Sequence, residues 1–241
     1  MEISTNNPGP SGDRNIHLKL DAGAIKGLKK MPVDMFDEHY LDEAHNNALI
    51  LCVDVRNFSD FLCVHEDDTV FRLIKEFTSN LLSCINQFGY GCSYYKLLGD
   101  GALVIWDESN ESTVNEALII FDSYTDFLSE ELFKPFDGIG LGGALVTEKI
   151  FKYEISAEVS QLKYRDYVGY GINLACRLQE LAGKNELVLN EALAKSGGIP
   201  FRVDKSPERL RELHVFKGLK ENDRQWVLFY DRETHGELTF F

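Results

Sequence analysis

Two aspartates stand at the ends of strand-like segments and could together bind divalent metal ions. Asp54 follows the apolar run 48–53, and Asp100 lies in a Gly-Asp-Gly turn between two further apolar runs. Carboxylate oxygens are the ligands that Mg²⁺ and Mn²⁺ prefer, and a pair of such ions can bridge the oxygens of a phosphate chain. Each aspartate alone is a common turn residue, so the metal-site hypothesis depends on the fold bringing both together.

A second pair of polar residues lies on a segment with helical periodicity, GYGINLACRLQEL. Asn173 and Arg177 are four residues apart in it, so on a helix they share one face. An arginine near the first turns of a helix that begins at a glycine is well placed to bind a phosphate. In isolation, the alternative is a solvated polar face that binds no ligand.

Other chemistries have weaker support in the sequence. Gly138, Gly140 and Gly143 satisfy G-x-G-x-x-G, but the segment continues as a strand, whereas a dinucleotide site needs the third glycine to begin a helix. The sequence contains no G-x-x-x-x-G-K-[ST] loop and no H-x-x-x-H metal spacing. Ser59 has no histidine partner nearby in sequence, which disfavours a nucleophilic hydrolase.

The elements that must position these residues follow the order strand, helix, strand, strand, helix, strand, which predicts a ferredoxin-like βαββαβ core. They are expected at 47–55, 68–88, 91–107 (a hairpin), 114–128 and 138–147. In this topology the first strand ends at the same edge of the sheet as the hairpin. Asp54 and Asp100 are therefore expected to meet although 46 positions separate them.

Further elements are expected on both sides of this core. A short helix is predicted over 35–44, and the charged segment 148–163 is either an insertion or a β-ribbon. After a helix over 170–182, strands are expected at 186–189, 199–203, 211–217 and 225–230. The domain prediction is an N-terminal tail with the short helix over 1–45, partly disordered, one domain over 46–233, and a C-terminal tail over 234–241.

The amino-acid composition argues against several classes of function. The 39 acidic and 25 basic side chains give a net charge of −14, which argues against binding to nucleic acid. A phosphorylated substrate would therefore need local cations or bound metal. No apolar run approaches the roughly 18 residues of a membrane-spanning helix, so no membrane span is expected. Five cysteines without a C-x-x-C pair indicate reduced thiols and a cytoplasmic protein.

Three sequence blocks together resemble the class III nucleotidyl cyclases, the adenylate/guanylate cyclase catalytic domain family. They are LCVDVRNFSDF, YKLLGDGALVIW and DYVGYGINLACRL, and they occur in the order found in that family. The similarity covers residues 47–231. It implies the class III cyclase fold, an α+β domain whose ferredoxin-like βαββαβ core carries additional C-terminal strands.

The resemblance implies a role for the first carboxylate pair. Asp54 and Asp100, with the backbone of Val55, would hold two ions of Mg²⁺ or Mn²⁺ per active site. The backbone from Val55 to Ser59, which includes Phe58, would bind the β- and γ-phosphates of a nucleoside triphosphate. The implied reaction is attack of the ribose 3′-oxygen on the α-phosphorus, with release of pyrophosphate and a 3′,5′-cyclic nucleotide.

The same resemblance implies roles for residues in the second half of the chain. Asn173 is similar to the ribose-orienting asparagine of the family and Arg177 to its transition-state arginine. Lys217 would contact the triphosphate, although Lys220 could do so instead.

The base of the substrate is left open by two conflicting indications. Lys96 and Asp166 fall where adenylate cyclases have their adenine-recognising residues, which implies ATP and cyclic AMP. However, a cyclase domain without a sensor, departing from that pattern at Leu97 and across 148–165, also resembles the stand-alone pyrimidine cyclases of Pycsar antiphage systems. We favour UTP or CTP, giving cyclic UMP or cyclic CMP that a separate effector would recognise.

The family resemblance also implies a partner. Its members form head-to-tail homodimers with shared active sites, so a homodimer with two equivalent sites is expected. One alternative is a different two-metal enzyme such as a diguanylate cyclase, but no GG[DE]EF-type turn is present. The other is a non-catalytic nucleotide-binding or dimerisation module.

Overall fold

The computed structural model describes residues 38–136, 138–157, 162–195, 211–212 and 226–230. These residues form two compact units, which are described separately. One contains Tyr153–Asp166 with the residues up to Leu41, and the other contains Asp42–Lys152 with the residues from Tyr167 onward. Lys217, Lys220 and the strand expected at 199–203 lie outside the described residues. The domain boundaries expected from the sequence stay a prediction.

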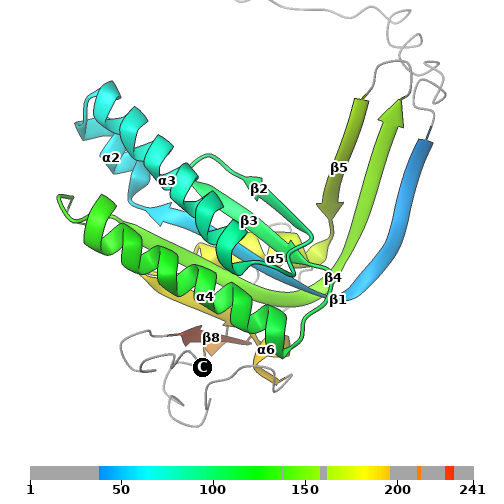
Figure 1. Ribbon diagram of the computed structural model, residues 1–241. Coiled ribbons are helices and arrows are strands. Elements are labelled where there is room, and N and C mark those ends of the chain that lie inside the picture. Colours follow the sequence, from blue (N-terminus) through cyan, green and yellow to red (C-terminus); the bar gives the residue numbers. More distant parts are fainter. Residues whose placement is uncertain (1–37, 137, 158–161, 196–210, 213–225, 231–241) are drawn as a thin grey trace, which may run out of the picture. The chain divides into compact units, whose positions relative to one another are not determined.

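The strands form one sheet with a mixed pattern of neighbours (Figure 1). Its order is β2 (Tyr94–Leu97), β3 (Gly101–Trp106), β1 (Glu38–Arg56), β4 (Gly140–Ala157), β6 (Glu186–Asn190), β8 (Trp226–Tyr230) and β7 (Arg211–Glu212), and β5 (Leu162–Val168) pairs with β4. Strand β3 is antiparallel to both β1 and β2, whereas β4 and β6 are parallel. The order β4-β1-β3-β2 is that of a ferredoxin-like core, so the predicted topology is confirmed.

Helices cover both faces of the sheet because β1 is apolar on both. The odd-numbered residues 49–55 join the core under α3 (Asp67–Phe88) and α4 (Glu111–Phe127), which lie side by side (Figure 1). The even-numbered residues 48–52 pack instead with α5 (Tyr170–Gln179). Alternating side chains of a strand point to opposite faces, so a strand covered on both sides must be continuously apolar.

The sequence prediction is wrong at the N-terminal end of this core. A short helix was expected over 35–44, but β1 already begins at Glu38 and runs unbroken to Arg56. Strand β1 has β3 and β4 as neighbours in the sheet. Local helix propensity is a weak preference that such pairing overrides.

Three further differences from the sequence prediction concern helices. Helices α2 (Phe58–Val64) and α6 (Glu191–Lys195) were not expected, and a π-helical turn, η2 (Leu128–Leu132), follows α4. Within α3, Leu73 is buried, whereas Phe71 is 71% exposed. The charged segment after 148 does form a β-ribbon, made by β4 and β5. None of the helices in the described ranges is both long and apolar enough to cross a membrane.

A buried tyrosine hydroxyl joins the two long helices and provides a test of the core. Tyr124 is 1% exposed, and its hydroxyl donates a 2.6 Å hydrogen bond to the backbone carbonyl of Phe77. Tyr124→Phe should lower the free energy of unfolding by about 1–2 kcal/mol, because a hydrogen bond in the protein interior is lost. Urea denaturation would measure it. Tyr90→Phe, at an 84% exposed tyrosine, is the control, and equal losses from both variants would contradict this role.

Candidate active site

The fold brings the two aspartates together as the topology predicted. Asp54 lies opposite Gly101 in the antiparallel pairing of β1 with β3, and Asp100 directly precedes Gly101. The backbone N–H of Val55 donates a 3.1 Å hydrogen bond to the backbone carbonyl of Asp100. The end of β1 and the β2–β3 turn therefore form one edge that carries both carboxylates.

The electrostatics of this edge suit a cation. The pKa of Asp54 is raised, mainly by burial and next by the negative charge of Asp100. The positive charge of Arg56 and a hydrogen bond with Gln179 lower this pKa, but by less. Two carboxylates that repel each other gain when a divalent ion binds between them. Within the described ranges no group of three or more His, Cys, Asp or Glu side chains could hold a metal. The pair fits Mg²⁺ or Mn²⁺, since Mg²⁺ is commonly held by one or two carboxylates together with substrate phosphates.

Arg56 also lies at this edge, although the sequence analysis gave it no role. Its side chain is 18% exposed, and its Nη1 lies 3.7 Å from Asp54 Oδ2. Its Nη2 donates a hydrogen bond to the backbone carbonyl of Gln179 at the end of α5. Burial lowers the pKa of the guanidinium. Arg56 thus supplies a cation beside the carboxylates and connects β1 to α5.

Gly142 on β4 makes room for this arginine. A methyl group on Gly142 would lie 2.0 Å from Arg56 Nε, which no side chain can tolerate without moving. The sequence analysis considered the neighbouring glycines of this segment for a dinucleotide site. In the structure, Gly142 instead permits the close approach of a side chain, which is a common role of glycine in a strand.

This contact predicts strong coupling between the two positions. Gly142→Ala should lower the free energy of unfolding by about 1–3 kcal/mol in the natural sequence, because the partly buried Arg56 side chain is displaced. In a protein that already carries Arg56→Ala, Gly142→Ala should lower the free energy of unfolding by less than half of that amount. Chemical denaturation of the four proteins would measure the coupling. Gly183→Ala is the control, since there an added methyl meets only a flexible Glu186 carboxylate, 3.3 Å away. Additive losses would contradict the model.

The segment predicted to bind phosphates is a tight turn from strand to helix. Asn57 adopts a left-handed conformation with φ of 61°, and its side-chain amide donates a 2.7 Å hydrogen bond to the Gly138 carbonyl. Phe58 is buried and stacks on Phe61, while Ser59 is exposed. The Phe58 side chain anchors the turn in the core, so it can offer a ligand only its backbone.

Helix α5 presents the second predicted pair on its outer side. Leu174, Ala175 and Leu178 are buried against the sheet, whereas Asn173 is exposed. The Arg177 side chain is 40% exposed, and its Nη1 donates a 2.8 Å hydrogen bond to Glu180. Both predicted catalytic residues are therefore accessible from outside the subunit that carries them.

The predicted base-binding residues lie in different units. On β2, Lys96 and Tyr94 are half-buried while Tyr95 is 51% exposed, as strand alternation requires. Asp166, in the unit with Tyr153, is buried, and the Tyr164 hydroxyl donates a 2.7 Å hydrogen bond to its Oδ2. The pKa of Tyr164 is raised, mainly by this hydrogen bond.

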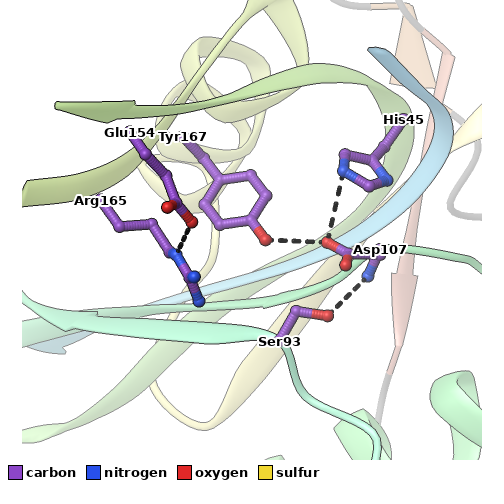
Figure 2. Close-up of polar contacts among 6 residues, drawn as sticks. All are labelled: His45, Ser93, Asp107, Glu154, Arg165 and Tyr167. Carbon is purple, nitrogen blue, oxygen red and sulfur yellow. Dashed lines mark hydrogen bonds and ion pairs between the residues drawn. The ribbon is translucent and has the colours of Figure 1, made fainter. Parts of the chain in front are cut away.

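A second polar cluster ties the end of β3 to the strand that precedes α5 (Figure 2). The Tyr167 hydroxyl donates a 2.9 Å hydrogen bond to Asp107 Oδ1, and His45 Nε2 lies 3.7 Å from the same oxygen. The Asp107 N–H donates to the Ser93 hydroxyl at 3.3 Å. In the other unit, Arg165 pairs with Glu154 (Figure 2). We interpret the Asp107 cluster as structural support for the start of α5.

Comparison with known proteins adds a fold assignment. No protein-family model matches this sequence, and no curated protein matches it. Among solved structures, the adenylyl cyclase CyaB from P. aeruginosa has a TM-score of 0.61 at 13% identity, over 81% of this chain and 100% of that chain. The guanylyl cyclase Cya2 has a TM-score of 0.61 at 16% identity, covering 79% and 93%.

A third similar structure contains a bound nucleotide. It is the guanylate cyclase domain of RhGC from Catenaria anguillulae in complex with GTP, with a TM-score of 0.60 at 9% identity, covering 78% of this chain and 97% of that chain. Identities this low define the fold and not the reaction. The described part of this chain has the α+β fold of the class III nucleotidyl cyclase catalytic domains.

Proposed function

We propose that the protein is a nucleotidyl cyclase, a phosphorus–oxygen lyase that converts a nucleoside triphosphate into a 3′,5′-cyclic nucleotide and pyrophosphate. The observation that carries the proposal is the meeting of Asp54 and Asp100 at one sheet edge, in a chain with the class III cyclase fold. A non-catalytic module would gain nothing from placing Asp100 where its charge raises the pKa of Asp54.

The carboxylate edge would hold the metal ions. Asp54, Asp100 and the backbone of Val55 are the proposed ligands for two ions of Mg²⁺ or Mn²⁺. When bound, these ions would lower the pKa of the ribose 3′-hydroxyl and neutralise the triphosphate. Arg56 adds a fixed positive charge to the same edge. This local charge would let a chain of net charge −14 bind a polyanion.

The outer face of α5 would act on the reacting atoms. Asn173 would orient the ribose so that its 3′-oxygen faces the α-phosphorus. Arg177 would stabilise the negative charge that grows on the α-phosphate in the transition state. Lys217 is proposed to contact the triphosphate, and the turn at Phe58 and Ser59 to contact the β- and γ-phosphates.

The placement of this pair supports a homodimer with shared sites. Within α5, Cys176 faces the Asp54 strand of its own subunit, while the neighbouring Arg177 is 40% exposed. Successive residues of a helix differ in direction by about 100°, so both cannot face the same strand. A second copy of the chain would then bring its carboxylate edge to the Asn173/Arg177 face.

The base is proposed to be a pyrimidine, with ATP as the alternative. A lysine donor and a carboxylate acceptor, here Lys96 and Asp166, can address a pyrimidine as well as an adenine. The similar solved structures include both adenylyl and guanylyl cyclases, so their fold does not select one base. The proposed product would be a second messenger in antiphage defence, recognised by a separate effector.

One experiment tests reaction and base together. Purified protein would be incubated with each of ATP, GTP, UTP and CTP in the presence of Mn²⁺, and the products identified by mass spectrometry. We expect cyclic UMP or cyclic CMP, and an Asp54→Asn protein purified in parallel controls for contaminating cyclases. Cyclic AMP would favour the alternative base. If no triphosphate yields a cyclic product, the cyclase proposal is wrong.

A further inference from the structure

Two cysteines from distant parts of the chain meet beneath the proposed active-site elements. Cys52 Sγ lies 3.9 Å from Cys176 Sγ, and 124 positions separate the two residues. Cys52 is 4% exposed and lies on β1, two residues before Asp54. Cys176 is half-buried and lies on α5, directly before Arg177.

We propose that Cys52 and Cys176 are a redox-active pair, in which a peroxide converts the two thiols into a disulfide that fixes α5 to β1. No proposed step of catalysis uses either sulfur. The proposal rests on the contact between the two thiols and on the elements that they would join.

Balanced chemistry leads from the two thiols to the disulfide. The Cys176 thiolate attacks one oxygen of hydrogen peroxide, the O–O bond breaks, and a sulfenic acid and hydroxide form. The Cys52 sulfur then attacks the Cys176 sulfur, the S–O bond breaks, and water leaves with the Cys52 proton. In sum, two thiols and one peroxide give one disulfide and two waters, so the thiols are oxidised and the peroxide is reduced.

The environment favours Cys176 as the first sulfur to react. It is the more exposed of the pair, and the pKa of its thiol is lowered to about 7, mainly because the Cys52 thiol donates a hydrogen bond to it. Burial instead raises the pKa of Cys84 and of Cys92. Reactivity toward peroxides follows thiolate content and exposure.

Closing the bond requires a small but consequential movement. A disulfide has an S–S length of about 2.05 Å, so the sulfurs must approach by roughly 2 Å from their 3.9 Å separation. Helix α5 packs on the sheet through Leu174, Ala175 and Leu178, all buried. A densely packed helix transmits such a displacement to its neighbours. Arg177 would move with Cys176, and Asp54 with Cys52.

The expected effect is a reversible loss of cyclisation. Catalytic groups displaced by about 1 Å can lose a hundredfold in rate, because reacting atoms must be held in a near-attack geometry. This effect on turnover rests on the proposed cyclase function, whereas formation of the disulfide does not.

Trypsin separates the two cysteines into distinct peptides, which makes the bond directly measurable. Residues 31–56 contain only Cys52 and residues 166–177 contain only Cys176. The full-length protein would be treated with hydrogen peroxide, alkylated and digested without reductant. We expect a linked 31–56/166–177 peptide that dithiothreitol abolishes. If Cys63, which is exposed, is oxidised but no linked peptide appears, the proposal is overturned.

Activity measurements test the consequence. The natural sequence should lose at least about tenfold in cyclisation rate after peroxide and regain it with dithiothreitol. Cys176→Ser should resist this loss, whereas Cys63→Ser should behave as the natural sequence does. Equal inactivation of Cys176→Ser would overturn the regulatory effect. If no protein cyclises any triphosphate, the proposed function fails while the linked peptide still decides the disulfide.

Discussion

Asp54→Ala and Arg177→Ala proteins are each expected to lose at least about 100-fold in cyclisation rate, and a mixture of the two should recover activity. Each variant removes one half of the proposed site. If the carboxylate edge of one subunit works with the α5 face of the other, a heterodimer contains one site with both defects and one site with neither. The recovered activity would come from that intact site.

The size of the recovery follows from symmetry. Random exchange of equal amounts makes half of the dimers heterodimers, each with one intact site of two, so about one quarter of the natural activity should return. A mixture of Asp54→Ala with Asp100→Ala is the matched control. Both changes lie on the same half of the site, so no intact site can form. Failure of the first mixture to recover, with heterodimers shown to form, would contradict the shared-site model.

The meeting of the two aspartates could be predicted because each depends on a local signal. An apolar run ended by a carboxylate marks the exit of a buried strand, and a Gly-Asp-Gly turn between apolar runs marks a hairpin. The order of the elements then fixes which sheet edges coincide. The proximity of Asp54 and Asp100 could be predicted from this topology alone, and the topology follows from the hydrophobic periodicity of the sequence.

The contacts of Arg56 at this sheet edge could not be predicted from local sequence signals. Arg56 contacts Gln179, which lies 123 positions away, and it passes Gly142 on a third element. These contacts depend on how closely α5 packs over the end of β1, and neither propensity nor periodicity encodes that distance. The contact between Cys52 and Cys176 was missed for the same reason. The strand at 38–44 was missed because pairing in a sheet outweighed local helix signals.

Asp100→Asn should make the metal-free protein more stable while abolishing most of its activity. The raised pKa of Asp54 has two main causes, burial and the charge of Asp100. The substitution keeps the shape of the side chain and removes the second cause. Without metal, ionised Asp54 would then be less disfavoured, so the thermal midpoint should rise by a few degrees. The cyclisation rate should fall by at least about 100-fold, because one of the proposed metal ligands is lost.

The pH dependence of the stability gain in Asp100→Asn shows whether the gain comes from the charge of Asp54 or from better packing. An aspartate whose pKa is raised by folding destabilises the folded state once the pH exceeds its unfolded value of about 3.9, and the penalty is complete above the folded pKa. The stability advantage of Asp100→Asn should therefore be present at neutral pH and should vanish as the pH falls below about 4. The activity of the natural protein should decline over the same acidic range, as Asp54 becomes protonated.

Bound metal should reverse the order of thermal stability between the natural protein and Asp100→Asn. Saturating Mn²⁺ should raise the thermal midpoint of the natural protein, since a ligand that binds the folded state stabilises it, and should raise that of Asp100→Asn much less. Thermal unfolding with chelator and with Mn²⁺, at neutral and acidic pH, would measure both effects. Glu76→Gln, which removes a charge from the exposed side of α3, is the control and should show neither effect. If Mn²⁺ stabilises natural and Asp100→Asn proteins equally, the metal ions do not bind at this carboxylate pair, and the two aspartates serve only the turn that joins β1 to the hairpin.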